Sequence, residues 1–242
     1  MGSITDPIPW PEKGDHLFSE QGNWHYNAIL DKFHNDWTAY IEGYGRAAQA
    51  LITHLENTGC AEVDFLVYPI IFLFRQHLEL RLKALIMEGD ALHDRDPKLH
   101  TIHKLEPLWA MCREVLESVW PEGSSETLDV VESCILELAA VDRGSCAFRY
   151  PVEKDGARSL PADLDRINLE HFGEVMVKIY NFFSGAHDGI SDYLQTKHEM
   201  DQEWRAEMEQ EWREEMEQEW REEAEQDWGP SPARSLHCTS AC

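Results

Sequence analysis

Residues 65–86 read FLVYPIIFLFRQHLELRLKALI, and this stretch decides the fold. Its first ten residues are almost wholly apolar, and side chains that can carry charge follow at short intervals. These are Arg75, His77, Glu79, Arg81 and Lys83. Ten apolar residues fall well short of the roughly 20 that span a bilayer, and a helix so apolar at its start does not suit the surface of a protein. We therefore predict a buried central helix whose charges must be explained.

The charges of this helix fall on two faces. At about 100° per residue, Arg75, Glu79 and Lys83 share one face, and His77 and Arg81 share another. If the first face is exposed, the Glu79–Lys83 pair contributes only about 0.2–0.5 kcal/mol. If it is buried, some of these charges point into a polar pocket where partners compensate for their desolvation. The sequence leaves both alternatives open.

The composition is that of a globular protein with a strongly acidic tail. The chain has 242 residues, of which 43% are hydrophobic, enough for the core of one sizeable domain. Its formal charge is −25, and residues 199–228 contain 14 acidic and 3 basic side chains. Nonspecific nucleic-acid binding requires Lys and Arg at the phosphates, so this balance disfavours a general DNA or RNA coat protein. A local basic pocket stays compatible with the composition.

The first residues and the cysteines favour a cytoplasmic protein. The first residues, MGSITDPIPWPEKGD, contain neither the basic nor the apolar region of a secretion signal. The six cysteines form no CxxC pair, and three of them lie at apolar positions of helical patterns. We therefore expect reduced thiols in the cytoplasm and no membrane contact.

Apolar side chains at helical spacing predict an all-α bundle of about five helices. No run alternates with period two over enough residues to build a sheet. The first predicted helix covers 24–55 and is ended by Gly59, and the second contains the stretch 65–86. Pro69 lies in the first turn of this second helix, or at a kink if the helix starts near Ala61. The other predicted helices are 103–119, which is ended by Pro121, a segment after Ser124 and Ser125, and about 167–194.

We divide the chain into four parts. They are an extended arm (1–22), a helical domain (23–198), an acidic helix (199–228) and a disordered tail (229–242). Within the domain, residues 142–165 form an irregular segment that is long for a helical bundle. Asp155-Gly156 in this segment predicts the turn of a small hairpin.

An eight-residue repeat dominates the acidic helix. It reads EWRAEMEQ from Glu203, EWREEMEQ from Glu211 and EWREEAEQ from Glu219. Glutamates four residues before Arg213 and Arg221 favour a helix. The Trp and Met positions advance by about 40° every four residues, so they spiral instead of forming the seam of a coiled coil. The repeat is compatible with a solvated helix and with a Trp-rich docking or self-association surface.

Familiar catalytic motifs are absent from the sequence. It contains no glycine-rich phosphate loop, no GxSxG and no HExxH. His93, His100 and His103 cluster before the third helix, and His237, Cys238 and Cys242 lie near the C-terminus, but neither set has an obvious carboxylate to support a metal. We predict no metal and no cofactor.

Two arrangements can carry chemistry. Arg149, with Asp142 and Ser145 nearby in sequence, can hold a phosphate or clamp the central helix, or simply pin its own loop. Arg166 and His171 have an R-x4-H spacing at the start of the last body helix. There an arginine can stabilise a phosphorane while a histidine moves protons to or from a ribose hydroxyl.

Four motifs in this order resemble a group of bacterial proteins with a HEPN-like helical fold. They are YPIIFLFRQHLELRLKALI, HKLEPLW, VDRGSCAFRYPVEKDG and INLEHFGEVM, and the resemblance covers roughly residues 24–194. HEPN proteins include metal-independent ribonucleases with an R-x4-6-H motif near the start of the last core helix. Two copies of the motif meet across a homodimer, in toxins and antiviral defence systems that are often paired with an antitoxin or nucleotidyltransferase.

The resemblance implies a site. Arg166 would position phosphate and His171 would act as general acid or base, although Ile167 stands where HEPN nucleases usually have a polar residue. The polar residues that recur in this subgroup correspond to Glu79, Lys83, His103, Asp142, Ser145 and Arg149. With Arg75, they imply either a relocated active site or a nucleotide-binding pocket.

We therefore predict an endoribonuclease of HEPN type in a toxin or antiviral-defence context. Its catalytic residues would be Arg166, His171 and Arg149, and it would form a homodimer. The alternative is a noncatalytic HEPN-like module that senses a nucleotide or binds a partner.

Overall fold

The computed structural model describes residues 9–30 and 37–227, and the regular structure in these ranges is helical. Its five α-helices are α1 (Trp37–Asn57), α2 (Val63–Leu92), α3 (Leu105–Val119), α4 (Ser125–Val141) and α5 (Leu169–Asp227). A 3-10 turn, η1, covers Trp24–Tyr26. The predicted all-α bundle of about five helices is confirmed for these ranges.

None of the helices described has an apolar stretch long enough to cross a membrane.

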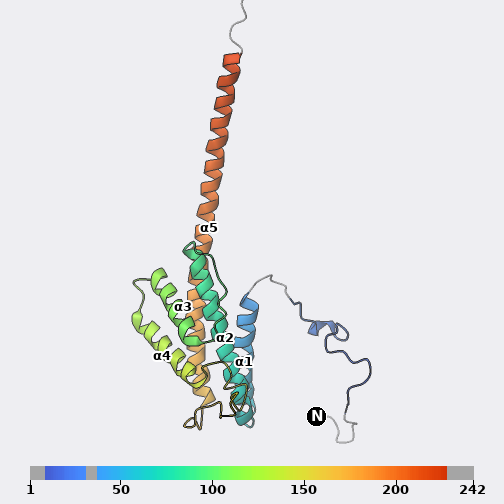
Figure 1. Ribbon diagram of the computed structural model, residues 1–242. Helices are drawn as coiled ribbons and strands as arrows, with labels where there is room; N and C mark the ends of the chain where they lie inside the picture. Colours follow the sequence, from blue (N-terminus) through green and yellow to red (C-terminus); the bar gives the residue numbers. More distant parts are fainter. Residues whose placement is uncertain (1–8, 31–36, 228–242) are drawn as a thin grey trace, which may run out of the picture. The chain divides into compact units, whose positions relative to one another are not determined.

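Helix α2 lies at the centre of the bundle. It packs against α1, α3 and α5, while α4 packs against α3 (Figure 1). Ile70, Leu78, Leu82 and Leu85 of α2 are essentially inaccessible to solvent. The long run of buried residues from Ile70 onward follows from the neighbours that α2 has on several sides, whereas Phe65 and Tyr68 in its apolar first part are exposed.

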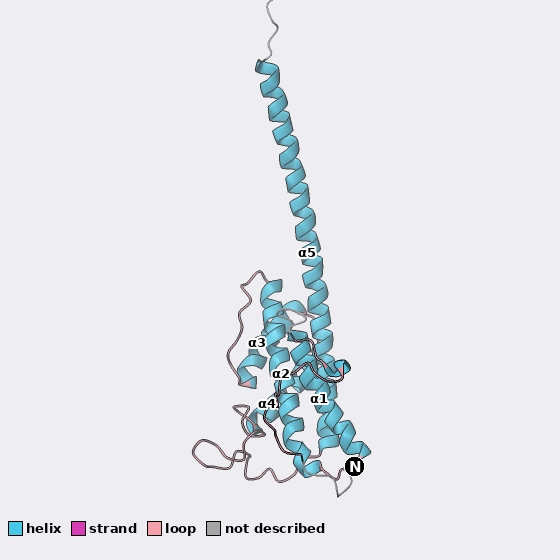
Figure 2. Cartoon of the chain, turned by 90° about the vertical axis from the view of Figure 1, so that its right-hand side faces the viewer, coloured by secondary structure: helices cyan, strands magenta, loops and turns pink. Residues whose placement is uncertain are grey.

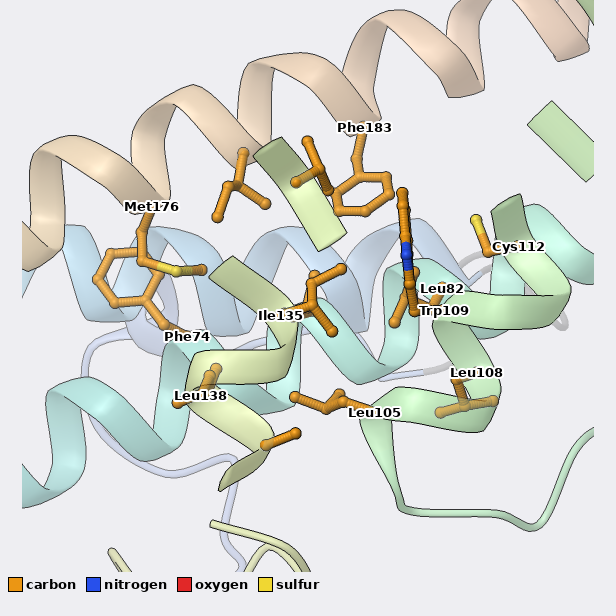
Figure 3. Close-up of a cluster of buried hydrophobic side chains, with 14 of the residues drawn as sticks. Phe74, Leu82, Leu105, Leu108, Trp109, Cys112, Ile135, Leu138, Met176 and Phe183 are labelled. Atoms are coloured by element: carbon orange, nitrogen blue, oxygen red, sulfur yellow. The ribbon is translucent and has the colours of Figure 1, made fainter. Parts of the chain in front are cut away.

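The core joins side chains from all five α-helices, including Ala48 and Leu55 of α1. Figure 3 shows Phe74 of α2, Trp109 of α3, Ile135 of α4 and Phe183 of α5 among the buried side chains of one cluster. The rings of Trp109 and Phe183 meet edge to face, with centroids 6.1 Å apart. Burial of aromatic and aliphatic side chains of this size is the main favourable contribution to folding.

The helix predicted over 24–55 begins later than expected. Within residues 24–30, Trp24–Tyr26 form a 3-10 turn and no α-helix follows, and the described part of α1 is Trp37–Asn57. The Asn23 side chain caps the start of the turn by accepting a hydrogen bond from the His25 N–H, and the turn ends where Asn27 is extended. Phe33, which the apolar pattern included, lies outside the described residues.

Residues 9–30 belong to a compact unit separate from the one that begins at Trp37.

Other predicted helix ends agree with the structure. Ser124 caps α4 by accepting a hydrogen bond from the Thr127 N–H, and α3 stops at Val119 before Pro121. Gly59 follows α1 with a φ of 65°, a conformation that glycine adopts without strain. Helix α2 already starts at Val63, so Pro69 lies inside it instead of in its first turn.

Helix α5 joins two predicted elements. It runs without interruption through the boundary placed between residues 198 and 199, so the last body helix and the acidic helix form one element of 59 residues (Figure 2). The predicted disordered tail, 229–242, with His237, Cys238 and Cys242, lies outside the described residues.

The predicted hairpin is reduced to a single bridge. Val152 and Arg158 form one isolated antiparallel bridge, and Gly156 at the turn has a φ of 86°. Asp155 accepts a hydrogen bond from the Ala157 N–H and so stabilises this turn.

Candidate functional site

The face of α2 that carries Arg75, Glu79 and Lys83 is buried. The Arg75 side chain is 0% exposed, and Glu79 and Lys83 are also buried. Glu79 Oε2 accepts from Arg75 Nη1 at 3.1 Å, and Glu79 Oε1 accepts from Lys83 Nζ at 2.8 Å. Of the two alternatives left open by the sequence, the structure therefore adopts the buried one.

Asp142, the residue after α4, connects this face to the irregular loop. Its Oδ2 lies 3.3 Å from Arg75 Nε, an ionic contact without the alignment of a hydrogen bond. Its Oδ1 accepts from the N–H groups of Cys146 at 2.8 Å and Ala147 at 3.0 Å. Ser145, which lies between Asp142 and Cys146 in the sequence, has a φ of 60°, which is uncommon for a residue other than glycine. Asp142 thus joins the loop after α4 to the charged face of α2.

His103 adds a surface residue to the contacts of Arg75 and Glu79. Its Nδ1 lies 2.8 Å from Glu79 Oε1, and its carbonyl accepts from Arg75 Nη2 at 2.7 Å. The ring itself is 69% exposed. We call Arg75, Glu79, Lys83, His103 and Asp142 the α2 network.

The α2 network satisfies its own charges. Burial raises the pKa of Glu79, but hydrogen bonds from Lys83, His103 and Arg75 outweigh burial, so this pKa lies below its usual value. The carboxylates of Glu79 and Asp142 balance the charges of Arg75 and Lys83. The network therefore fastens the loop and the start of α3 to the central helix, instead of offering free charges to a ligand.

The second polar face of α2 points toward α1 and α5. His77 Nδ1 lies 2.9 Å from the Ile41 carbonyl oxygen, and its ring stacks on Tyr180 with centroids 5.3 Å apart. Glu42 accepts from Arg81 Nη2 at 3.1 Å and from the Tyr180 hydroxyl at 2.7 Å. Burial lowers the pKa of His77, which keeps its ring neutral at pH 7.

The sequence did not predict that Glu42 and Tyr180 meet this face of α2. The need of a buried Arg81 for an acidic partner can be predicted from the sequence. Which of 46 acidic residues supplies that partner cannot, because the contact joins helices that are distant in sequence.

A cavity of about 290 Å³ lies between α2, α4 and the start of α5. Its lining is mostly apolar, with Ile71, Leu78, Leu138, Phe148, Val175 and Ile179 among the residues that form it. Arg166 and His171 also line it, and both are exposed, which places them at its mouth. The structure thus brings the two residues of the R-x4-H spacing to one cavity.

Asn168 fixes the start of α5 at this mouth. Its Oδ1 accepts from the His171 N–H at 3.0 Å, and its carbonyl accepts from the Phe172 N–H at 3.0 Å. The free N–H groups and dipole of a helix N-terminus favour an anion nearby. Asn168 was also missed, although an Asn just before an apolar run at helical spacing is a usual cap signal.

Arg149 does not line the cavity. Its guanidinium lies 5.5 Å from the centroids of the Phe72 and Tyr150 rings, and its Nε donates to the Ser145 carbonyl. These contacts correspond to the structural alternative considered for Arg149, in which it pins its own loop.

The predicted histidine cluster is divided between separate contacts. His93 Nε2 lies 2.9 Å from Ser118 Oγ, whereas His103 contacts Glu79. Across residues 9–30 and 37–227, no three His, Cys, Asp or Glu side chains come together as metal ligands.

Comparisons of the chain with protein-family models, curated proteins and solved structures found no match. The HEPN-like assignment therefore stays a prediction from the sequence motifs. What the chain can do chemically depends on the cavity and on the residues at its mouth.

Proposed function

We propose that this chain is a HEPN-like, metal-independent endoribonuclease whose active site is the mouth of the cavity. The observation that supports this proposal is that Arg166 and His171 line the same cavity and are both exposed. In the part of the chain that the structure describes, neither side chain has an ion-pair or hydrogen-bond partner. Both are thus free to meet a substrate.

The chemistry would be transfer of a phosphoryl group within RNA. Arg166 holds the scissile phosphate, and the N-terminus of α5 adds a favourable dipole. A ribose 2′-hydroxyl attacks the adjacent phosphorus, and the 5′-oxygen of the next nucleotide leaves. The 2′-hydroxyl gives up its proton to His171, which acts as the base, and the leaving 5′-oxygen takes a proton from the protonated imidazole or from water. The products are a 2′,3′-cyclic phosphate and a 5′-hydroxyl.

The charge of −25 constrains how RNA is bound. A protein with few basic side chains gains little from counterion release, so its RNA affinity should depend weakly on salt. A single-stranded segment that reaches one local site fits this charge better than a long duplex.

We further propose that the active form is a cytoplasmic homodimer in a toxin or antiviral-defence system. An antitoxin or a nucleotidyltransferase would be its protein partner, as the resemblance implies. Size measurement in solution tests the dimer directly.

The test of catalysis is RNA degradation in the presence of EDTA. Arg166→Ala/His171→Ala should abolish cleavage, and Arg149→Ala should retain it if its folded fraction is unchanged. The matched control is His198→Ala/Arg205→Ala, which removes the same two side-chain types from exposed positions of α5. Cleavage that survives loss of Arg166 and His171, or that ends only with Arg149→Ala, would contradict the proposed site.

One observation favours the noncatalytic alternative. The mouth leads into an apolar cavity large enough for a flat heterocycle, and Phe148 and Phe172 are among its lining residues. A free nucleotide could place its base in the cavity and its phosphate beside Arg166.

This alternative predicts nucleotide binding without RNA cleavage. AMP, GMP, CMP and UMP are added one at a time, and the melting temperature is measured. Val175→Phe, which fills part of the cavity, should remove any shift, whereas ribose 5-phosphate should give none. A shift that persists in the filled variant would place nucleotide binding elsewhere.

A further inference from the structure

The C-terminal part of α5 exposes three tryptophans on an acidic helix. Their exposed fractions are 62% for Trp204, 63% for Trp212 and 72% for Trp220. We call residues 199–227 the tail helix, which extends past the other helices of the bundle (Figures 1 and 2). Tryptophan is the side chain that gains most from burial or from an aromatic contact, so three at this exposure indicate a binding surface.

The tail helix does not need these tryptophans for its own stability. Arg213 pairs with Glu209 at 3.0 Å, and Gln210 and Gln218 donate to Glu214 and Glu222. These contacts four residues apart stabilise a helix through its polar side chains. The tryptophans therefore stay available for another molecule.

The apolar positions wind around the tail helix. Between Trp204 and Trp220 the direction of the side chain turns by about 160° over a rise of about 24 Å. A straight partner helix would meet only part of this stripe, whereas an extended, flexible segment can follow it.

The charge of the tail helix selects the chemistry of the partner. Residues 199–227 contain 14 acidic and 3 basic side chains. A second copy of the same helix would bring like charges together, which disfavours self-association. A cationic segment gains from both features, and arginine suits them best, because its guanidinium stacks on indole and pairs with carboxylates.

We propose that the tail helix binds an extended, arginine-rich segment of another protein. Guanidinium groups stack on Trp204, Trp212 and Trp220, and further arginines pair with the glutamates between them. This interaction is independent of any chemistry at the cavity.

The experiment uses the full chain and two probes, a nona-arginine and a nona-lysine peptide. Binding is measured by calorimetry and tryptophan fluorescence at about 0.15 M salt, where long-range attraction is screened. Trp204→Ala/Trp212→Ala/Trp220→Ala keeps every charge, and circular dichroism verifies that the helix is retained. Trp10→Ala, which removes a tryptophan that is 79% exposed outside the tail helix, is the matched control.

The triple variant should bind nona-arginine at least about tenfold more weakly, with a smaller loss for nona-lysine. Trp10→Ala should bind both peptides as the wild type does. Equal affinity in the triple variant and the wild type would overturn the proposal, because charge alone would then explain binding. The absence of nona-arginine binding by the wild type, or an oligomer that dissociates in the triple variant, would overturn it as well.

Discussion

Glu79 connects three side chains of the α2 network through its two oxygen atoms. Its Oε1 meets Lys83 and His103, and its Oε2 meets Arg75. Arg75 and Lys83 are both buried, and Arg75 also meets Asp142, so a change at Glu79 leaves Lys83 as the buried cation without a charged partner among the described residues.

Glu79→Gln should therefore lower the free energy of unfolding by about 3–5 kcal/mol, measured by urea denaturation. Glu209→Gln is the matched control, because Glu209 also pairs with a cation four residues later, but on the exposed tail helix. The control should change stability by no more than about 0.5 kcal/mol. Similar effects of the two substitutions would show that burial does not strengthen the pairing of Glu79.

His77 makes stability depend on pH. Burial lowers its pKa in the folded protein, with Arg81 acting in the same direction and the Ile41 carbonyl and Glu42 opposing it. The unfolded chain thus binds this proton more readily, so the contribution of His77 is complete above about pH 6.5 and is lost as the pH falls toward its folded pKa.

His77→Gln should flatten this dependence. Between pH 7 and pH 5, urea midpoints should fall less steeply in the variant than in the wild type. His187 works in the opposite sense, because its hydrogen bond to Glu88 raises its pKa, but it is present in both proteins and cancels from the comparison. Parallel pH profiles would contradict the proposed neutral state of His77.

At the scale of elements, the approach of α2 to α3 depends on a glycine. A Cβ added at Gly89 would lie 2.3 Å from Val115 Cγ1, closer than two carbons can approach. Either the valine or one of the helices must then move.

Gly89→Ala should cost about 1–3 kcal/mol of stability, measured by thermal or urea denaturation. Gly43→Ala is its control, since Gly43 lies inside α1 with no atom near the added methyl group, and it should stabilise the protein by up to about 1 kcal/mol. Val115→Ala should restore part of the loss in a double variant. A neutral Gly89→Ala substitution would show that the α2–α3 contact adapts without cost.

At the scale of the molecule, the bundle should fold without the tail helix. The core cluster includes α5 residues such as Met176, Phe183 and Ile190, all of which precede Glu199. Deletion from Glu199 onward should leave the melting temperature of the bundle within about 2 °C, because it removes no buried contact of this cluster. A large decrease, or loss of a dimer on size measurement, would show that the tail helix supports the assembly.

Most elements could be predicted from local signals. The residue types alone predict the cap at Ser124, the end of α1 before Gly59 and the end of α3 before Pro121. The predicted start of the first helix at Trp24 was wrong, because Asn23 caps a 3-10 turn over Trp24–Tyr26 and Asn27 is extended. The hairpin turn was located correctly, but whether two short segments pair over one bridge or several depends on packing.

The sequence by itself determined a buried central helix with two polar faces, because apolar content and helical spacing are properties of neighbouring residues. It left open whether the charges of α2 are exposed or are buried beside partners. Only the tertiary structure decided that Asp142 and Glu42 are those partners, and that Arg166 and His171 share a cavity while Arg149 lies outside it. These contacts join distant parts of the chain, and their geometry is fixed by how the helices pack.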